Sequence, residues 1–258
     1  MDEKIRSALN QLAASHNVRI LLAVESGSRA WGFASTDSDY DVRFIYAHPA
    51  DWYVSVETKR DVIEATFEGD IDAAGWDVRK ALGLLRKSNP PLLEWLRSPI
   101  IYDEDTAFTG AMRRFAGTYY SPDRCFQHYL HMAEGNARRY LQGKLVSLKK
   151  YFYVLRPVCA CRWIERGLGP VPMEFTELVR HTVDHSSLRS VIDELVERKR
   201  SAEELDRAPR IPAISNFIEE ELTRLAAIAP PKTELPPPDD LDEFLRKTIR
   251  GLTPTTCV

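Results

Sequence analysis

The apolar positions of the first hundred residues switch between a helical period and a strand period. Four of them recur at helical spacing near the N-terminus and predict an amphipathic helix over residues 3–15. Residues 18–24 (VRILLAV) form a short apolar run rich in β-branched residues, which predicts a buried strand. In residues 40–46 every second position is apolar or aromatic, so a second strand is expected there. Shorter strands are expected over residues 53–56, 62–67 and 71–73.

The remaining pattern is mainly helical. Asp77 suits the N-cap of an expected helix over residues 78–87, and a further helix is expected over residues 91–96. After about residue 105 the strand signals nearly vanish. Helices are then predicted over residues 126–142, 145–166, 175–180, 187–199, 215–228 and 241–252.

These elements predict an α+β protein with two parts. Residues 1–105 are expected to form a small domain with a mixed sheet and flanking helices. Residues 106–258 are expected to form an all-helical domain, with a Pro-rich extended connector near residues 230–240. A chain of 258 residues is long enough for two modest domains.

Chemistry-bearing residues gather around the second strand. Asp39, Asp41 and Arg43 occupy alternate positions, so their side chains point to one face. Carboxylates on one face repel each other, and a hard divalent cation such as Mg²⁺ would relieve that repulsion. Upstream, Gly27 and Ser28 follow the first strand, where glycine allows a close backbone approach and a helix start binds phosphate. The combination predicts a nucleoside triphosphate bound with its metal.

Other motifs built on the same residues fit less well. The D-x-D-x-D run that begins at Asp37 resembles an EF-hand opening, but Val42 and His48 stand where that loop needs Gly and Glu. The G-K-[ST] of a P-loop and the G-x-G-x-x-G of a dinucleotide site are absent from the sequence. An isolated D-x-D also occurs in glycosyltransferases and on solvated strand faces, where a GS turn has no special role.

Composition and charge set limits on the function. The net charge of −3 and the pI of about 6.1 show no global basic excess, although a local basic surface stays possible. The sequence has neither a secretory signal nor an apolar stretch long enough to span a membrane, so a cytoplasmic location is expected. The cysteines form no zinc pattern and are expected to be free, buried thiols in a reducing compartment. They are Cys125, Cys159, Cys161 and Cys257.

Two sets of motifs carry a resemblance to a known family. GSRAWG followed by SDYD resembles the nucleotidyltransferase signature of the polymerase-beta superfamily, a GS turn and short helix followed by D-x-D on the next strand. GWDVRKALGLLRKSNPPLLEWLRSPIIY and KKYFYVLRP are similar to a narrower bacterial and phage nucleotidyltransferase family associated with RNA repair pathways. The likeness extends from about residue 20 to about residue 220.

The resemblance implies catalytic and metal-binding roles for matching acidic positions. Asp39 and Asp41 would ligate Mg²⁺ or Mn²⁺, and a third carboxylate on a neighbouring strand would complete the set. Asp72 matches that position best and would be both a metal ligand and a catalytic residue. The other candidates for the third carboxylate are Glu64, Asp70 and Asp77, the last of which is already explained as a helix cap.

The resemblance also implies nucleotide-binding residues. Gly27 and Ser28 would hold the triphosphate. Further contacts to the nucleotide are expected from Arg29, Ser38, Arg43, Lys149 and Lys150. The two arginines are equally well explained as ion-pair partners of the acidic face, and the two lysines as a solvated basic face. Tyr151 and Tyr153 could stack on a base, but aromatic residues on such a helix are more often part of the core.

The implied reaction is the transfer of a nucleoside monophosphate from an NTP to an acceptor hydroxyl by a two-metal mechanism, with pyrophosphate as the leaving group. The active site would lie in the cleft between the two domains. The family favours an RNA 3′ end as acceptor and RNA-repair proteins such as a ligase or a kinase-phosphatase as partners. A small-molecule or protein acceptor is an alternative, and so is a non-catalytic, antitoxin-like binding partner.

Overall fold

The structure, a computed structural model, describes residues 1–201 and 207–251 of the 258-residue chain. The chain forms two compact units, and each collects segments that are far apart in the sequence. Unit 1 combines residues 1–27, residues 39–120 and the described chain from Glu234 onward. Unit 2 combines residues 28–38 with residues 121–233. The domain boundary expected at residue 105 stays a prediction, because compactness alone does not define a domain that folds independently.

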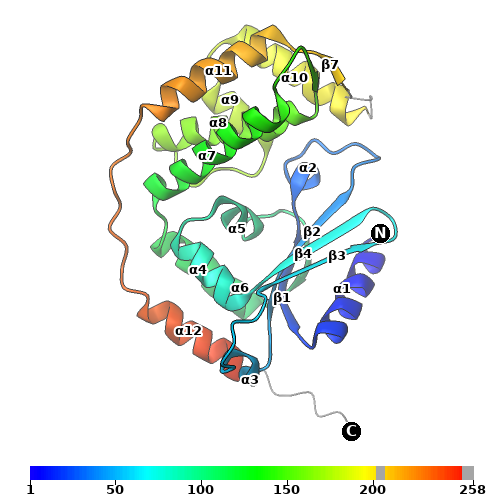
Figure 1. Ribbon diagram of the computed structural model, residues 1–258, viewed down its shortest axis with the longest axis vertical. Helices are drawn as coiled ribbons and strands as arrows, with labels where there is room; N and C mark the ends of the chain where they lie inside the picture. Colours follow the sequence, from blue (N-terminus) through cyan, green and yellow to red (C-terminus); the bar gives the residue numbers. More distant parts are fainter. Residues whose placement is uncertain (202–206, 252–258) are drawn as a thin grey trace. The chain divides into compact units, whose positions relative to one another are not determined.

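A five-stranded mixed sheet is the framework of unit 1 (Figure 1), with the strand order β3-β4-β2-β1-β5. Its central pair, β2 (Tyr40–Ala47) and β4 (Ile71–Asp77), is parallel, and the other three pairs are antiparallel. The remaining strands are β1 (Arg19–Glu25), β3 (Val62–Phe67) and β5 (Ile101–Glu104). The predicted α+β class is therefore confirmed.

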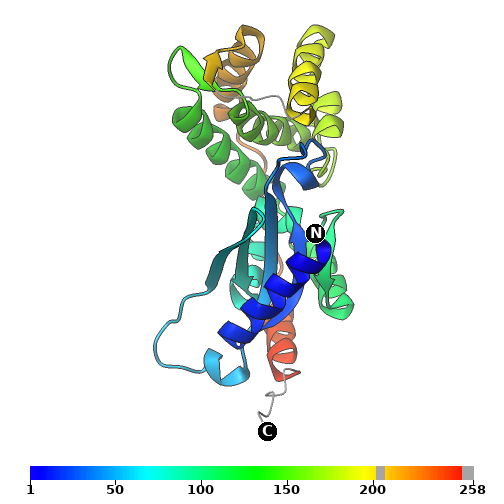
Figure 2. The same ribbon diagram turned by 90° about the vertical axis from the view of Figure 1, so that its right-hand side faces the viewer.

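Helices cover both faces of this sheet because its strands present apolar side chains on both sides. Phe44 packs with the apolar stripe of α1 (Asp2–His16), which crosses one face (Figure 2). Its neighbour Ile45 points to the other face and packs among helices there. Those helices are α4 (Val78–Arg86), α5 (Pro90–Trp95), α6 (Thr106–Thr118) and α12 (Asp239–Arg250).

The core of unit 2 is built around α8 (Lys150–Glu165), which is buried on nearly every side. A helix that is apolar all round is typical of such a central position. Its contacts come from α7 (Pro122–Tyr140), α9 (Phe175–Thr182) and α11 (Pro212–Ala226), and α10 (Ser186–Arg200) packs beside the last two. A two-stranded ribbon of β6 (Leu145–Ser147) and β7 (Arg207–Pro209) completes the described part of the unit.

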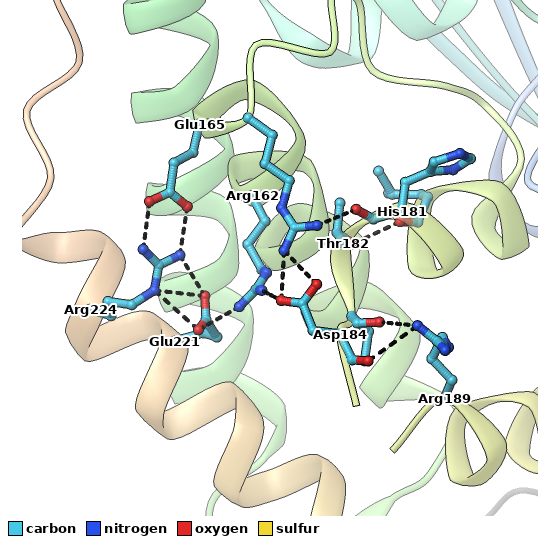
Figure 3. A network of polar contacts seen from close by, with 11 residues as sticks. Arg162, Glu165, His181, Thr182, Asp184, Arg189, Glu221 and Arg224 are labelled. Carbon is cyan, nitrogen blue, oxygen red and sulfur yellow. Dashed lines mark hydrogen bonds and ion pairs between the residues drawn. The ribbon is translucent and has the colours of Figure 1, made fainter. Parts of the chain in front are cut away.

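Charged side chains tie α8 to α11 and to the segment between α9 and α10 (Figure 3). Arg162 of α8 contacts Glu221 at 2.6 Å and Asp184 at 2.7 Å. Arg224 binds Glu221 at 2.9 Å and Glu165 at 2.6 Å, and its hydrogen bonds lower the pKa of Glu165. Glu221 is buried, and its negative charge would be costly in the interior without a partner. The two arginines pair with it and so offset that cost.

Two of the expected segments are wrong. Residues 53–56 do not form a strand: the short helix α3 (Ala50–Tyr53) ends there, and Val54 and Val56 are exposed in the turn that follows. The helix expected from residue 145 begins only at Lys150, because β6 pairs with the distant strand β7 instead. β5 and α6 were not predicted.

The described cysteines, Cys125, Cys159 and Cys161, are buried and free, as expected. Burial raises the pKa of Cys159 to about 11, so this thiol is protonated at neutral pH. Cys257 and the end of the helix expected over residues 241–252 lie outside the described residues. Across residues 1–201 and 207–251, no helix has both the length and the apolar character needed to cross a membrane.

Candidate active site

The parallel pairing of β2 and β4 brings two carboxylates side by side. Asp41 of β2 stands directly opposite Asp72 of β4 in the strand register. Both side chains retain solvent access, with exposed fractions of 30% and 54%. Asp39, two residues before Asp41, is exposed as well and acts electrostatically on it. The three acidic residues predicted as metal ligands therefore belong to one end of the sheet.

Arg43 bridges the opposed carboxylates. Its Nη2 donates to Asp41 Oδ1 at 2.9 Å and to Asp72 Oδ2 at 2.9 Å, and its Nη1 donates to the Asp72 backbone oxygen at 2.9 Å. Burial nevertheless raises the pKa of Asp41, and repulsion from Asp72 and Asp39 adds to that rise while Arg43 opposes it. Arg43 thus opposes the repulsion between the two carboxylates that it bridges.

Gly27 lies against Asp41 in a conformation that suits glycine. Its φ is +60°, and a Cβ atom placed there would lie 2.0 Å from Asp41 Oδ2. The preceding residue, Ser26, donates its N–H to the Asp41 backbone oxygen at 2.9 Å. Ser28 follows at the start of α2 (Gly27–Ala30), and its hydroxyl has no hydrogen-bond partner among the described residues. The turn therefore offers a close backbone approach next to an acidic group and a hydroxyl that is available to a ligand.

Glu25 is a buried carboxyl group that the sequence analysis did not single out. It ends β1, is 0% exposed, and its Oε1 accepts the N–H of Asp41 at 2.8 Å. Its Oε2 accepts a short hydrogen bond from the hydroxyl of Tyr102 on β5. Glu25 therefore fixes the backbone of Asp41 from behind. A glutamate at the end of an apolar run gives no signal of this role, because both partners come from other strands.

The three other candidates for the third carboxylate have structural partners. Asp77 is buried and caps α4 by accepting the N–H of Arg79 at 2.8 Å, as predicted for a helix cap. Glu64 on β3 pairs with Arg60 at 2.5 Å. Asp70 has a φ of +58° in the turn before β4, and its backbone oxygen accepts the N–H of Tyr40. Among the four, Asp72 is the one that faces Asp41.

The segment between Ser28 and Ser38 belongs to unit 2 and is held by hydrogen bonds within that unit. Arg29 donates to the backbone oxygen of Ser38 at 2.7 Å, so these two predicted nucleotide-binding residues contact each other. The Ser38 hydroxyl accepts the N–H of Ser35, and Lys199 of α10 reaches the Ser35 hydroxyl at 3.2 Å. These contacts give Arg29 and Ser38 a structural role in shaping the loop that carries Ser28.

Comparison with known proteins identifies the family. Residues 1–247 match the RNA repair pathway DNA polymerase beta family. The chain belongs to this family. The resemblance seen in the GS turn and the D-x-D strand is therefore confirmed, and the chain is a polymerase-beta-like nucleotidyltransferase.

Two individual proteins are similar to this member of the RNA repair pathway DNA polymerase beta family. The uncharacterized protein YcgL of Bacillus subtilis (strain 168) is 49% identical over 231 residues, which cover 89% of this chain and 88% of YcgL. A solved structure of a nucleotidyltransferase-like protein from Exiguobacterium sibiricum 255-15 is 13% identical, with a TM-score of 0.34, and covers 96% of this chain and 80% of that one.

The acidic residues carry the oxygen donors that a divalent cation of the kind implied by the polymerase-beta-like family prefers. Within the described residues, no group of three or more His, Cys, Asp or Glu side chains is arranged so that it could hold a metal ion by itself. Mg²⁺, however, is usually held by one or two carboxylates together with substrate phosphates rather than by an all-protein cage. Asp39, Asp41 and Asp72 offer only hard oxygen donors, and the electrostatic effect of Asp39 and Asp72 on Asp41 shows that the three belong to one acidic group.

Lys149 and Lys150 belong to unit 2, where Lys150 begins α8. Lys149 is exposed, and Lys150 lies over the rings of Tyr140 and Tyr153 at 4.8 and 4.6 Å from their centroids. Tyr151 is fully buried and hydrogen-bonded to Ser215, as expected for a core residue. Tyr153 departs from that expectation, because its exposed fraction is 39%.

A cavity of about 720 Å³ in unit 1 lies away from the acidic group. It is lined by Arg19 and Ile20 at the start of β1 and by Ala47 at the end of β2. Asp41 and Asp72 lie near the starts of β2 and β4, and Gly27 follows the end of β1, so all three are at the opposite end of the sheet. The cavity is therefore not part of the candidate active site.

Proposed function

We propose that this protein transfers a nucleoside monophosphate from an NTP to an acceptor hydroxyl at an RNA 3′ end. The observation that carries the proposal is the pairing of Asp41 with Asp72 beside a glycine that no larger residue can replace without a clash. An acidic group of this kind, next to a turn with a free hydroxyl, is suited to a triphosphate and its divalent cations. Membership in the RNA repair pathway family supports RNA as the acceptor.

In the proposed site, Gly27 and Ser28 bind the triphosphate, and Asp39, Asp41 and Asp72 hold two divalent cations. These cations would neutralise phosphate charge and lower the pKa of the acceptor hydroxyl. The acceptor oxygen forms a bond to the α-phosphorus, the bond from that phosphorus to the bridging oxygen breaks, and pyrophosphate leaves. Asp72, the more exposed of the opposed carboxylates, takes the proton of the acceptor hydroxyl. Arg43 keeps the two carboxylates close enough to act together.

Incorporation of label from α-labelled NTPs tests the proposal. Each NTP is incubated with Mg²⁺ or Mn²⁺ and with an RNA bearing a 3′-OH, the same RNA bearing a 3′-phosphate, or a DNA bearing a 3′-OH. We expect label only on ends with a free hydroxyl, and most on RNA. Label found only on DNA would show that DNA, and not RNA, is the acceptor. If a cell lysate replaces the RNA, label on protein or on small molecules would likewise identify a different acceptor. An absence of label from folded protein would overturn the enzymatic proposal and favour a binding role.

Two substitutions decide which residue is the third carboxylate. Asp72→Asn should lower the rate of transfer by about 100-fold or more, because a positioned acid–base group contributes on that scale. Asp70→Asn is the matched control, since Asn tolerates the positive φ at that turn and should leave the rate near that of the wild type. The reverse result would assign the role to Asp70.

A further inference from the structure

Positive charge is concentrated in one stretch of unit 2. Between Glu134 and Glu165 the sequence has seven Lys or Arg residues and no Asp or Glu, in a chain whose net charge is −3. Two of the seven, Arg156 and Arg162, point into the unit and bond to backbone or carboxylate groups there. The other five lie at the end of α7, in the β6 region and at the start of α8. They are Arg138, Arg139, Lys144, Lys149 and Lys150.

Most of these surface cations lack a carboxylate partner among residues 1–201 and 207–251. Arg138 approaches Glu134 at 4.0 Å. The remaining four make no ion pair with any residue that the structure describes; they are Arg139, Lys144, Lys149 and Lys150. Burial lowers the pKa of Lys150, and the nearby charges of Lys149 and Arg139 lower it further. A group of unpaired like charges costs free energy unless an anion neutralises it.

Aromatic rings are interleaved with these cations. Lys150 lies between Tyr140 and Tyr153, and Arg139 lies 5.1 Å from the centroid of the Tyr140 ring. The Trp31 ring meets Tyr153 edge-on, with centroids 5.9 Å apart. Tyr153 is 39% exposed although it stands on the central helix of the unit, whereas its neighbour Tyr151 is fully buried. Cation–π contacts would stabilise the junction of α7 and α8. They do not explain why the Tyr153 ring is exposed, or why the cations make no ion pair with a described residue.

We propose that this basic–aromatic surface, made of Arg139, Tyr140, Lys144, Lys149, Lys150 and Tyr153, binds a single-stranded nucleic acid. Bases would stack on the tyrosine rings, and the cations would contact successive phosphates, which is the usual combination for single strands. More than one ring and four cations without an ion pair in the described part of the chain match a strand of several nucleotides better than one mononucleotide. The surface would hold the acceptor strand, so the inference rests on the proposed function. Lys149 and Lys150 would then bind the acceptor strand and not the nucleotide that the sequence predicted for them.

The test is direct binding without catalysis. A fluorescently labelled single-stranded RNA of about 12 nucleotides is titrated with the full chain in EDTA, and its anisotropy gives Kd. Tyr153→Ala should raise Kd by about 10-fold, because stacking of one base contributes on that scale, and Tyr153→Phe should restore tight binding since it keeps the ring. The double variant Lys144→Gln/Lys149→Gln should reduce the slope of log Kd against log salt by about 0.7 for each cation removed.

Matched controls separate this surface from general charge effects and from the active site. Lys4→Gln/Arg6→Gln removes two exposed cations of α1 in unit 1 and should leave RNA binding unchanged. Asp41→Asn should also keep RNA binding while it removes transfer. Because Lys144 and Lys149 are exposed, their double variant keeps the test decisive even if Tyr153→Ala fails to fold.

The outcomes distinguish the two proposals. RNA binding that depends on Tyr153 and Lys149, without transfer from any NTP, would support the surface and overturn the proposed enzymatic function. Transfer to RNA with binding unaffected by these variants would overturn the surface and leave the function in place. The surface inference would also fail if neither RNA nor a DNA of the same sequence binds, or if the variants weaken binding of a labelled ATP instead of the strand.

Discussion

At the scale of single residues, Glu25 shows how the acidic group is supported from within the sheet. Its carboxyl group is fully buried and accepts hydrogen bonds from the Asp41 N–H and the Tyr102 hydroxyl. These bonds connect β1 with β2 on one side and β5 on the other. Because Glu25 is 0% exposed and accepts the Asp41 N–H, we infer that it acts on the acidic group by positioning Asp41.

Replacement of Glu25 should separate hydrogen bonding from charge. Glu25→Gln keeps an acceptor for the Asp41 N–H and should retain most of the stability. Glu25→Met removes the acceptor that Glu25 offers to the Asp41 N–H and to the buried Tyr102 hydroxyl, which should lower the free energy of unfolding by roughly 2–4 kcal/mol. Urea denaturation of both variants measures the difference. Equal stability of the two would show that these hydrogen bonds do not matter.

His48 is a second residue whose surroundings predict a measurable property. Its ring stacks on Trp52, with the ring centroids 4.2 Å apart. Burial lowers the pKa of His48 from 6.5 to about 4, and Lys59 and His16 make smaller contributions. The folded state therefore resists protonation of His48, whereas the unfolded state takes up the proton near pH 6.5. It follows that stability is lost as pH falls from about 6.5 towards 4.

The variant His48→Phe isolates this effect, since it keeps an aromatic ring over Trp52 but cannot titrate. Between pH 6.5 and 4 the thermal unfolding temperature should fall less steeply in the variant than in the wild type. NMR titration of the His48 ring gives the pKa independently. A ring that titrates near 6.5 in the folded protein would contradict the prediction.

At the scale of elements, the turn from β1 into α2 depends on Gly27. Gly27→Ala should be costly for two reasons, the positive φ and the clash of the new Cβ with Asp41. Gly69 is a matched control, because its φ is +86° and a Cβ there would meet nothing within 4 Å. Both variants bear backbone strain, but only Gly27→Ala also displaces Asp41.

We therefore expect Gly69→Ala to lower the unfolding temperature modestly and to leave transfer activity unchanged. Gly27→Ala should lower it further and should also abolish the stabilisation that Mg²⁺ with ATP gives the wild type. Differential scanning fluorimetry with and without Mg²⁺ and ATP measures both effects. Similar behaviour of the two variants would mean that the contact between Gly27 and Asp41 does not affect the binding of Mg²⁺ with ATP.

Elements with a strong local pattern could be predicted from the sequence. β2 alternates between apolar or aromatic and charged residues from Tyr40 to Phe44, and α4 begins at Val78 after the expected N-cap Asp77. β5 has only four residues, and β6 has three, so their patterns are too short to distinguish a strand from a loop or a helix. Their pairing partners lie far along the chain, and this long-range pairing decides their structure.

In the acidic site, too, some residues could be predicted from a local pattern and others could not. Asp39 and Asp41 follow from strand alternation, but Asp72 was favoured only through the family resemblance. Its place opposite Asp41 depends on the parallel register of β2 and β4, which no local pattern fixes. Glu25 could not be predicted, because its partner Tyr102 is 77 residues away in the sequence. Residues that act through distant contacts thus need the tertiary structure.

At the scale of the whole molecule, the last described helix of each unit packs against helices that precede it in the chain. After the Pro-rich stretch, α12 returns to unit 1, where Leu241 is buried and Phe244 packs against Phe108 at 5.5 Å. In unit 2, α11 packs on α7 and α8 through residues that include the fully buried Leu225. The two leucines are therefore comparable anchors in different units.

Leu241→Ala and Leu225→Ala should reveal whether each unit is stabilised separately. Each substitution removes a buried side chain and should lower the local free energy of unfolding by about 2–5 kcal/mol. Hydrogen exchange measured by mass spectrometry should then accelerate in α4 and α6 for Leu241→Ala, and in α7 and α8 for Leu225→Ala, with the other unit unchanged. Because unit 1 is assembled from three segments of the chain and unit 2 from two, accelerated exchange throughout the protein in both variants would instead show that the units unfold as one cooperative body.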